Sequence, residues 1–158
     1  MPTSFSYSAQ TKLPRPHVWD LLTDITNWPK FSDIYCDLHW VGRPWGEGSL
    51  LVGTLRYPIE VSGHYEIKTC QPPTLIRYLS QTREAGFATE RTLRLEETSP
   101  GTIIRVDSFV VGEPKISGGA AEFLSKLSKR WIDDFAGFCD VQAEGNGNRL
   151  KNGADERT

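Results

Sequence analysis

Residues 116–138 read ISGGAAEFLSKLSKRWIDDFAGF. Large apolar side chains recur three or four residues apart from Ile116 to Phe138, and charged side chains lie between them. This spacing is typical of an amphipathic α-helix with one broad apolar face. We predict a single long helix that ends near Gly145. Because an apolar face of this width must be buried, the helix needs a large partner surface elsewhere in the chain.

The segments that precede this helix indicate an antiparallel sheet. Stretches rich in β-branched and aromatic residues are separated by short linkers rich in Gly, Pro or Ser. These stretches are residues 34–41, 49–57, 59–70, 74–83, 87–97 and 102–111. A further strand is predicted at residues 4–13, where Phe5, Tyr7 and Ala9 alternate with other residues. Short linkers favour antiparallel neighbours, so we expect the six later strands to form a meander.

Two short helices are expected between the first two strands. Val18 and Leu22 are spaced for one helical face, which predicts a helix over residues 17–24. Pro29 limits a second helix, over residues 25–31, to a turn or two. The predicted fold class is therefore α+β: a seven-stranded curved antiparallel sheet wrapped around the long C-terminal helix, with two short helices between strands 1 and 2.

The composition indicates the class of protein. Of the 158 residues, 38% are hydrophobic and 24% are charged, which suits one globular domain. The 18 Lys and Arg nearly balance the 20 Asp and Glu, so no basic field favours nucleic acid. No apolar run approaches the roughly 20 residues of a transmembrane helix, although transient contact with a membrane surface stays open, as does the oligomeric state. We predict one domain over residues 1–144 and a disordered tail over residues 145–158, which has little to bury.

Cysteine and histidine positions argue against a disulfide framework and a metal site. Cys36, Cys70 and Cys139 are odd in number and widely spaced. His39 lies three residues from Cys36, on the opposite face of a strand, so the two cannot chelate one ion together. Met1–Ser4 lack the charged and apolar regions of a secretion signal. We therefore expect a cytoplasmic protein with no metal and no cofactor.

One segment resembles a known family. Residues 18–31, VWDLLTDITNWPKF, resemble the helix pair of the polyketide cyclase/dehydrase and lipid-transport family, part of the START/Bet v 1-like (SRPBCC) superfamily of helix-grip proteins. Residues 71–73 (QPP), 100–102 (PGT) and 118–119 (GG) are similar to the family's pattern, and the resemblance covers residues 3–143. It implies a hydrophobic cavity between sheet and helix. It transfers no catalytic residue, because the superfamily includes lipid carriers, hormone receptors and cyclases without one shared catalytic motif.

Strand alternation predicts the side chains that face this cavity. On residues 87–96 the apolar face includes Arg91 in mid-strand. A buried guanidinium needs a partner, and two remain open: an oxygen of a ligand, or a carboxylate of the last helix such as Asp133 or Asp134. On residues 74–83 the alternation leaves two inward faces open, one with Ile76, Tyr78 and Ser80 and the other with Leu75, Arg77 and Leu79.

The candidate ligand-binding residues combine apolar walls with a few polar groups, which is typical of a ligand pocket. They are Arg91, Tyr57, Tyr65, Tyr78, Phe87, Ser108, Trp40, Phe123, Leu127 and Trp131. Tyrosines on strands and aromatic residues on the last helix also suit a filled core. Trp40 clusters with Trp45 and Tyr35 beside a Pro/Gly-rich loop, where the three line a cavity mouth or anchor the loop.

We predict that the protein binds a hydrophobic small molecule, such as a lipid, a polyketide or an isoprenoid, in this cavity. The alternative is a cyclase or dehydratase that uses Arg91 and a tyrosine to polarise a carbonyl group. An interaction subunit with a filled core is the third class. Gly118 and Gly119 each weaken the first turn of the last helix by about 1 kcal/mol relative to Ala, so we expect ligand to enter there.

Overall fold

The computed structural model describes residues 4–56, 60–82, 88–111 and 118–156, with the backbone alone at residues 61, 82, 110–111, 118–124 and 146–156. The elements in chain order are β1 (Ser4–Thr11), α1 (Arg15–Thr23), the 3₁₀ helix η1 (Ile25–Asn27), α2 (Trp28–Phe31), β2 (Tyr35–Val41), β3 (Leu50–Leu55), β4 (Val61–Gln71), β5 (Leu75–Thr82), β6 (Ala88–Thr98), β7 (Gly101–Val111) and α3 (Gly118–Glu156). The second predicted helix is divided into η1 and α2, and Pro29 occupies the first turn of α2, where its missing N–H costs nothing.

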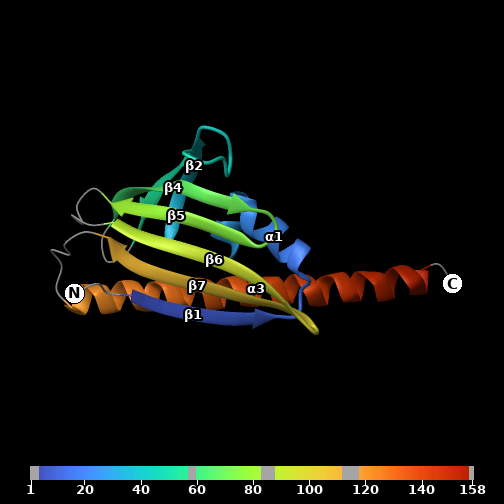
Figure 1. Ribbon diagram of the computed structural model, residues 1–158. Helices are drawn as coiled ribbons and strands as arrows, with labels where there is room; N and C mark the ends of the chain where they lie inside the picture. The colour runs from blue at the N-terminus through green and yellow to red at the C-terminus, as the bar shows by residue number, and fades with distance from the viewer. Residues whose placement is uncertain (1–3, 57–59, 83–87, 112–117, 157–158) are drawn as a thin grey trace.

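The strands form one antiparallel sheet in the order β1-β7-β6-β5-β4-β3-β2. Consecutive strands from β2 to β7 pair with one another as a meander, and β1 pairs with β7. Figure 1 shows α3 running alongside β1 and β7 on one side of the sheet, while β2 stands steeply to these strands. The predicted seven-stranded α+β fold is confirmed, with β1 and β2 as its two edges.

One core lies between the inner face of the sheet and α3. On α3, Ile132 and Phe135 are completely buried. On β5, Ile76 and Tyr78 are buried whereas Arg77 is exposed, so the ambiguous alternation is settled in favour of Tyr78 facing inward. Further core side chains come from α1 and the other strands: Val18, Leu22, Leu51, Ile67, Leu93, Leu95, Ile104 and Val106.

Aromatic rings of α2 pack against aromatic rings of α3. The ring centroid of Phe31 lies 5.2 Å from that of Phe135 and 5.6 Å from that of Trp131. Trp28 meets Trp131 edge to face, with 5.4 Å between centroids. Because these contacts hold the start of β2 beside α3, they also position the site described below.

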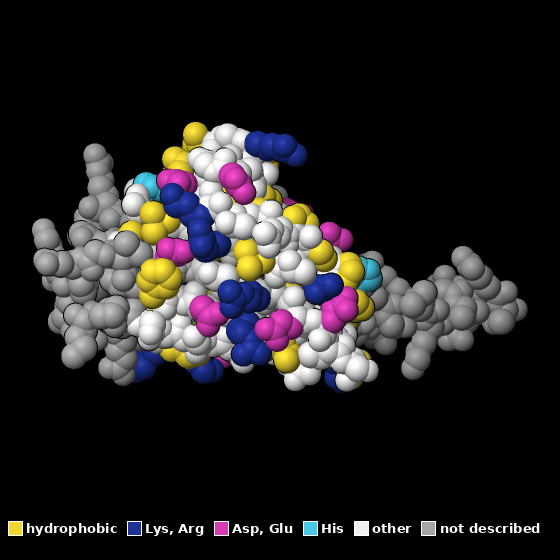
Figure 2. All heavy atoms as spheres, viewed as in Figure 1, with side chains coloured by type: hydrophobic (Ala, Val, Ile, Leu, Met, Phe, Trp, Pro, Cys, Tyr) yellow, Lys and Arg dark blue, Asp and Glu magenta, His cyan; other side chains and the backbone are white. Residues whose placement is uncertain are grey.

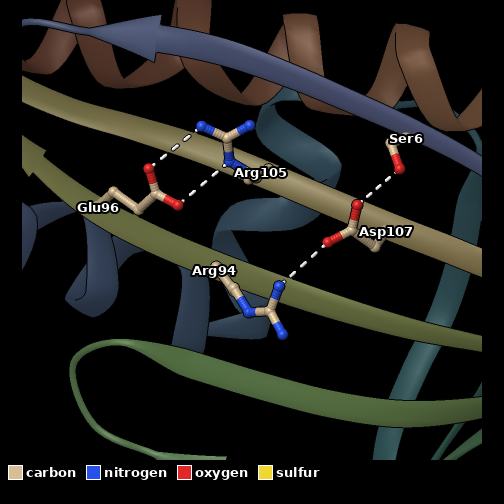
Figure 3. Close-up of polar contacts among 5 residues, drawn as sticks. All are labelled: Ser6, Arg94, Glu96, Arg105 and Asp107. Carbon is tan, nitrogen blue, oxygen red and sulfur yellow. Dashed lines mark hydrogen bonds and ion pairs between the residues drawn. The ribbon is translucent and has the colours of Figure 1, made fainter.

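The outer face of the sheet carries charged side chains of both signs (Figure 2). Figure 3 shows two cross-strand ion pairs on it: Arg94 with Asp107 at 3.3 Å, and Arg105 with Glu96 at 3.2 Å. Asp107 also accepts a hydrogen bond from Ser6 of β1 at 2.6 Å. Exposed pairs of this kind contribute little stability, but they show that alternate residues of β6 and β7 point to solvent.

Helix α3 is longer than the sequence predicted. It ends at Glu156 rather than near Gly145, and its C-terminal part extends past the sheet (Figure 1). The apolar periodicity ends before this segment, which is why the prediction stopped there. A helical backbone satisfies its own hydrogen bonds, however, and continues without an apolar partner.

Deleting residues 145–158 is expected to lower the melting temperature by less than about 2 °C, which corresponds to about 0.5 kcal/mol for a domain of this size. The segment has few apolar side chains to bury, so its removal exposes little surface. Thermal unfolding of residues 1–144 beside the full chain, followed by circular dichroism, measures the difference. A fall of many degrees would contradict the predicted domain boundary at residue 144.

Candidate ligand-binding site

Four side chains from four strands meet at the inner face of the sheet: Tyr35 of β2, Tyr65 of β4, Tyr78 of β5 and Arg91 of β6. We call them the Tyr–Arg cluster. Tyr78 lies directly opposite Arg91 in the register of β5 and β6. The ring centroid of Tyr65 is 4.9 Å from that of Tyr78 and 5.7 Å from that of Tyr35. Nη1 of Arg91 donates a hydrogen bond to the hydroxyl of Tyr35 at 3.4 Å.

The guanidinium of Arg91 is incompletely paired. Its Nε atom is buried without a hydrogen-bond partner, and no carboxylate within the described ranges forms an ion pair with it. Asp133 and Asp134, which the sequence analysis considered as partners of Arg91, pair within α3 instead. Asp133 pairs with Lys129 at 2.8 Å and Asp134 with Arg130 at 3.7 Å. A cation one helical turn away is the nearer partner for each.

The cluster is a cation surrounded by neutral phenols. Burial alone would lower the pKa of the Arg91 guanidinium, but the phenol oxygens of Tyr35, Tyr78 and Tyr65 raise it, so Arg91 stays charged. Burial raises the pKa of Tyr65 and of Tyr78, and the positive charge of Arg91 opposes both shifts. Neutral phenols donate hydrogen bonds but are poor bases. The arrangement therefore suits an anionic or carbonyl oxygen.

Other buried polar atoms of the same core have no hydrogen-bond partner among the described residues. Ser108 of β7 lies directly opposite Arg91, and its Oγ is one of them. On α3, the Oγ of Ser128 and the Nε1 of Trp131 likewise have no partner in the described part of the chain. A buried polar group without a partner costs about 1–3 kcal/mol. Such atoms on both the sheet and the helix are positions that an oxygen-bearing ligand can satisfy.

The structure places the sequence-predicted residues in three groups. Tyr65, Tyr78 and Ser108 lie at Arg91, while Leu127 and Trp131 lie on α3, where Leu127 packs at the margin of the core. Trp40 instead packs on Trp45, with 4.9 Å between centroids, and the indole N–H of Trp45 donates to the carbonyl of Thr23 at 2.6 Å. Trp40 thus contributes to anchoring its loop. Tyr57, Phe87 and the side chain of Phe123 lie outside the described residues. The contact of each predicted residue with a ligand stays a prediction.

Sequence analysis missed the role of Tyr35. It placed this residue beside a loop, whereas its hydroxyl reaches Arg91, which lies 56 positions later in the chain. Strand alternation describes one strand at a time, so no local signal could join β2 to β6.

A cleft of about 730 Å³ opens beside the cluster. Its walls come from η1, α2, the linker that follows α2, β2, the residue after β3, and α3. The lining residues are Ile25, Thr26, Pro29, Phe31, Ser32, Asp33, Tyr35, Cys36, Asp37, Leu38, Arg56 and Arg130. Cavities that bind drug-sized molecules fall in the same range of volume.

The described residues offer neither a metal site nor a membrane-spanning helix. Within the part of the chain that the structure describes, no three His, Cys, Asp or Glu side chains come together as metal ligands. No described helix combines the length and the apolar character needed to cross a membrane.

No family model and no curated protein sequence matches the chain, but solved structures do. Ara h 8.0201 has a TM-score of 0.72 at 14% identity, over 88% of this chain and 98% of that one. The Zhui aromatase/cyclase from Streptomyces sp. R1128 has a TM-score of 0.72 at 11% identity, over 90% and 96%. CalU16 from Micromonospora echinospora has a TM-score of 0.65 at 17% identity, over 96% and 84%. With this topology and these likenesses, the chain has a Bet v 1-like helix-grip fold.

Proposed function

We propose that the protein binds a hydrophobic small molecule that carries an anionic or carbonyl oxygen, in the space between the sheet and α3. The incompletely paired guanidinium of Arg91 carries this proposal. A charge withdrawn from water is costly unless an opposite charge and hydrogen bonds compensate it. Arg91 is partly buried, with its Nε atom fully so, and the neutral phenols of Tyr35 and Tyr78 offer it hydrogen bonds but no opposite charge. A ligand oxygen at Arg91 would supply the missing compensation.

The surroundings of Arg91 support an apolar ligand with a polar end. Tyr78 lies opposite Arg91, Tyr65 packs on Tyr78, and Leu93 and Val106 of the same inner face are buried. Such walls accept hydrocarbon or aromatic rings, while the cluster orients one oxygen. We place this function in the cytoplasm, because the three cysteines are free thiols.

Native mass spectrometry of freshly purified protein tests the proposal. We expect a fraction of the protein to carry a small molecule of defined mass, and we expect Arg91→Leu protein prepared in parallel to carry less of it. The matched control is Arg94→Leu, which removes a guanidinium from the outer face of the same strand. Equal loading of both variants would contradict a role for Arg91.

A second candidate function is cyclisation of a polyketide-like substrate. The likeness to an aromatase/cyclase and the phenol donors beside Arg91 favour it, because clustered donors stabilise the negative charge that develops on a carbonyl oxygen. Binding remains the better-supported function, since the described ionisable groups of the cluster are a guanidinium and phenols rather than a base. Incubation with a synthetic poly-β-ketone separates the two: an enzyme releases a product lighter by one water, and a binding protein returns the compound unchanged.

A further inference from the structure

Tyr35 connects the cleft to the Tyr–Arg cluster. It lines the cleft, and its hydroxyl accepts the hydrogen bond from Arg91. We propose that small molecules reach Arg91 through this cleft, between the edge strand β2 and helices α2 and α3, and pass Tyr35 on the way. This inference rests on the proposed function and names its route of access.

The position of the cleft at a sheet edge favours such a route. β2 is the last strand of the sheet, so a molecule that passes it separates no pair of strands. The strand is irregular there: its pairing with β3 shifts register between Cys36 and His39, and Asp37 has a positive φ of 56°. Irregularities of this kind turn side chains away from regular alternation. The result is a wall on which Tyr35, Cys36, Asp37 and Leu38 all line the same cleft.

The chemistry of the walls matches an amphipathic molecule. Ile25, Pro29, Phe31 and Leu38 offer apolar surface. Arg130 of α3 lines the cleft too, and it donates to Asp33 of the linker after α2 at 2.8 Å. Both partners are about half exposed, each with 49% of its side-chain surface accessible. An exposed ion pair contributes little and breaks readily in water, so this pair can open and close across the route.

Cys36 allows the route to be blocked reversibly. In a Cys70→Ser background, benzyl methanethiosulfonate is directed to Cys36, because Cys139 is buried and burial raises its pKa to about 12. The probe is 1-anilinonaphthalene-8-sulfonate, an aromatic sulfonate whose fluorescence reports binding in stopped flow. We expect the adduct, verified by mass, to slow association and dissociation of the probe about tenfold, and dithiothreitol to restore both rates.

Two controls come from the chain itself. The same reagent on Cys70 of a Cys36→Ser protein should leave both rates unchanged, because Cys70 does not line the cleft. Arg130→Ala should raise both rates several-fold, whereas Lys129→Ala, which breaks the neighbouring pair with Asp133, should not. Circular dichroism of each protein verifies that the fold is intact.

The outcomes separate this inference from the proposed function. Unchanged probe rates with the adduct on Cys36 would overturn the route, and failure of Cys36 to react would show that the cleft is closed. Slower association in a Gly118→Ala, Gly119→Ala variant, without an effect at Cys36, would place access at the first turn of α3 instead. Probe binding that is absent, or that is insensitive to Arg91→Leu, would contradict the proposed function itself.

Discussion

Replacing Arg91 with Leu is expected to weaken binding of 1-anilinonaphthalene-8-sulfonate by about 1.5–3 kcal/mol, the usual contribution of a hydrogen bond to a charged group. This corresponds to a roughly 10- to 150-fold rise in Kd. The substitution keeps much of the side-chain volume and removes the only cation that faces Tyr65 and Tyr78 among the described residues. The folded protein should lose little stability or gain some, because no carboxylate in those residues is left without its partner.

A probe without the sulfonate shows how much of the affinity depends on the probe's negative charge. N-phenyl-1-naphthylamine has the same rings without the sulfonate, and its affinity should be equal for the wild-type and Arg91→Leu proteins. Arg94→Leu is the matched variant: Arg94 lies three positions later on the outer face, where it pairs with Asp107, and its loss should leave both affinities unchanged. Fluorescence titrations measure the affinity of each protein for each probe, and thermal melts measure the stability of each protein. A large loss of stability with unaltered selectivity would show that Arg91 is structural.

Replacing Trp28 with Ala is expected to lower the free energy of unfolding by about 3–5 kcal/mol, the usual range when a large aromatic core residue is truncated. Trp28 is only 4% exposed, and its indole N–H donates to the carbonyl of Leu22 at 2.9 Å. Its ring touches those of Tyr35, Trp45 and Trp131, with centroids 6.3, 6.4 and 5.4 Å away. Truncation therefore loosens α2 from both β2 and α3.

Urea unfolding followed by circular dichroism measures this loss. Trp28→Phe keeps a ring and removes the donor, so its cost should be nearer 1 kcal/mol plus the smaller packing change. Trp40→Ala removes a half-buried ring that packs on Trp45, and it should cost less than Trp28→Ala. A Trp28→Ala protein within about 1 kcal/mol of wild type would show that the surrounding rings collapse into the cavity.

Sequence reasoning succeeded where the physical signal is local. The period of two along residues 87–96 placed Arg91 inward and Arg94 outward, and the structure agrees, because successive side chains of any strand point to opposite faces. The period near 3.6 identified α3, but it could not find the end of the helix, since residues beyond Gly145 continue it without an apolar face. The inward face of β5 was undecided until the burial of Tyr78 was known.

Short-range periodicity and short linkers were enough to predict the order of elements, their antiparallel pairing and the inward direction of Arg91, which is partly buried. The tertiary structure alone decided what Arg91 meets. Three strands separate β2 from β6 in the sheet, yet the hydroxyl of Tyr35 reaches Arg91, because the sheet twists and coils and carries its edge strand back toward the core. The cleft has the same origin, since its walls come from η1, α2, β2, α3 and the residues next to them, which only packing brings together.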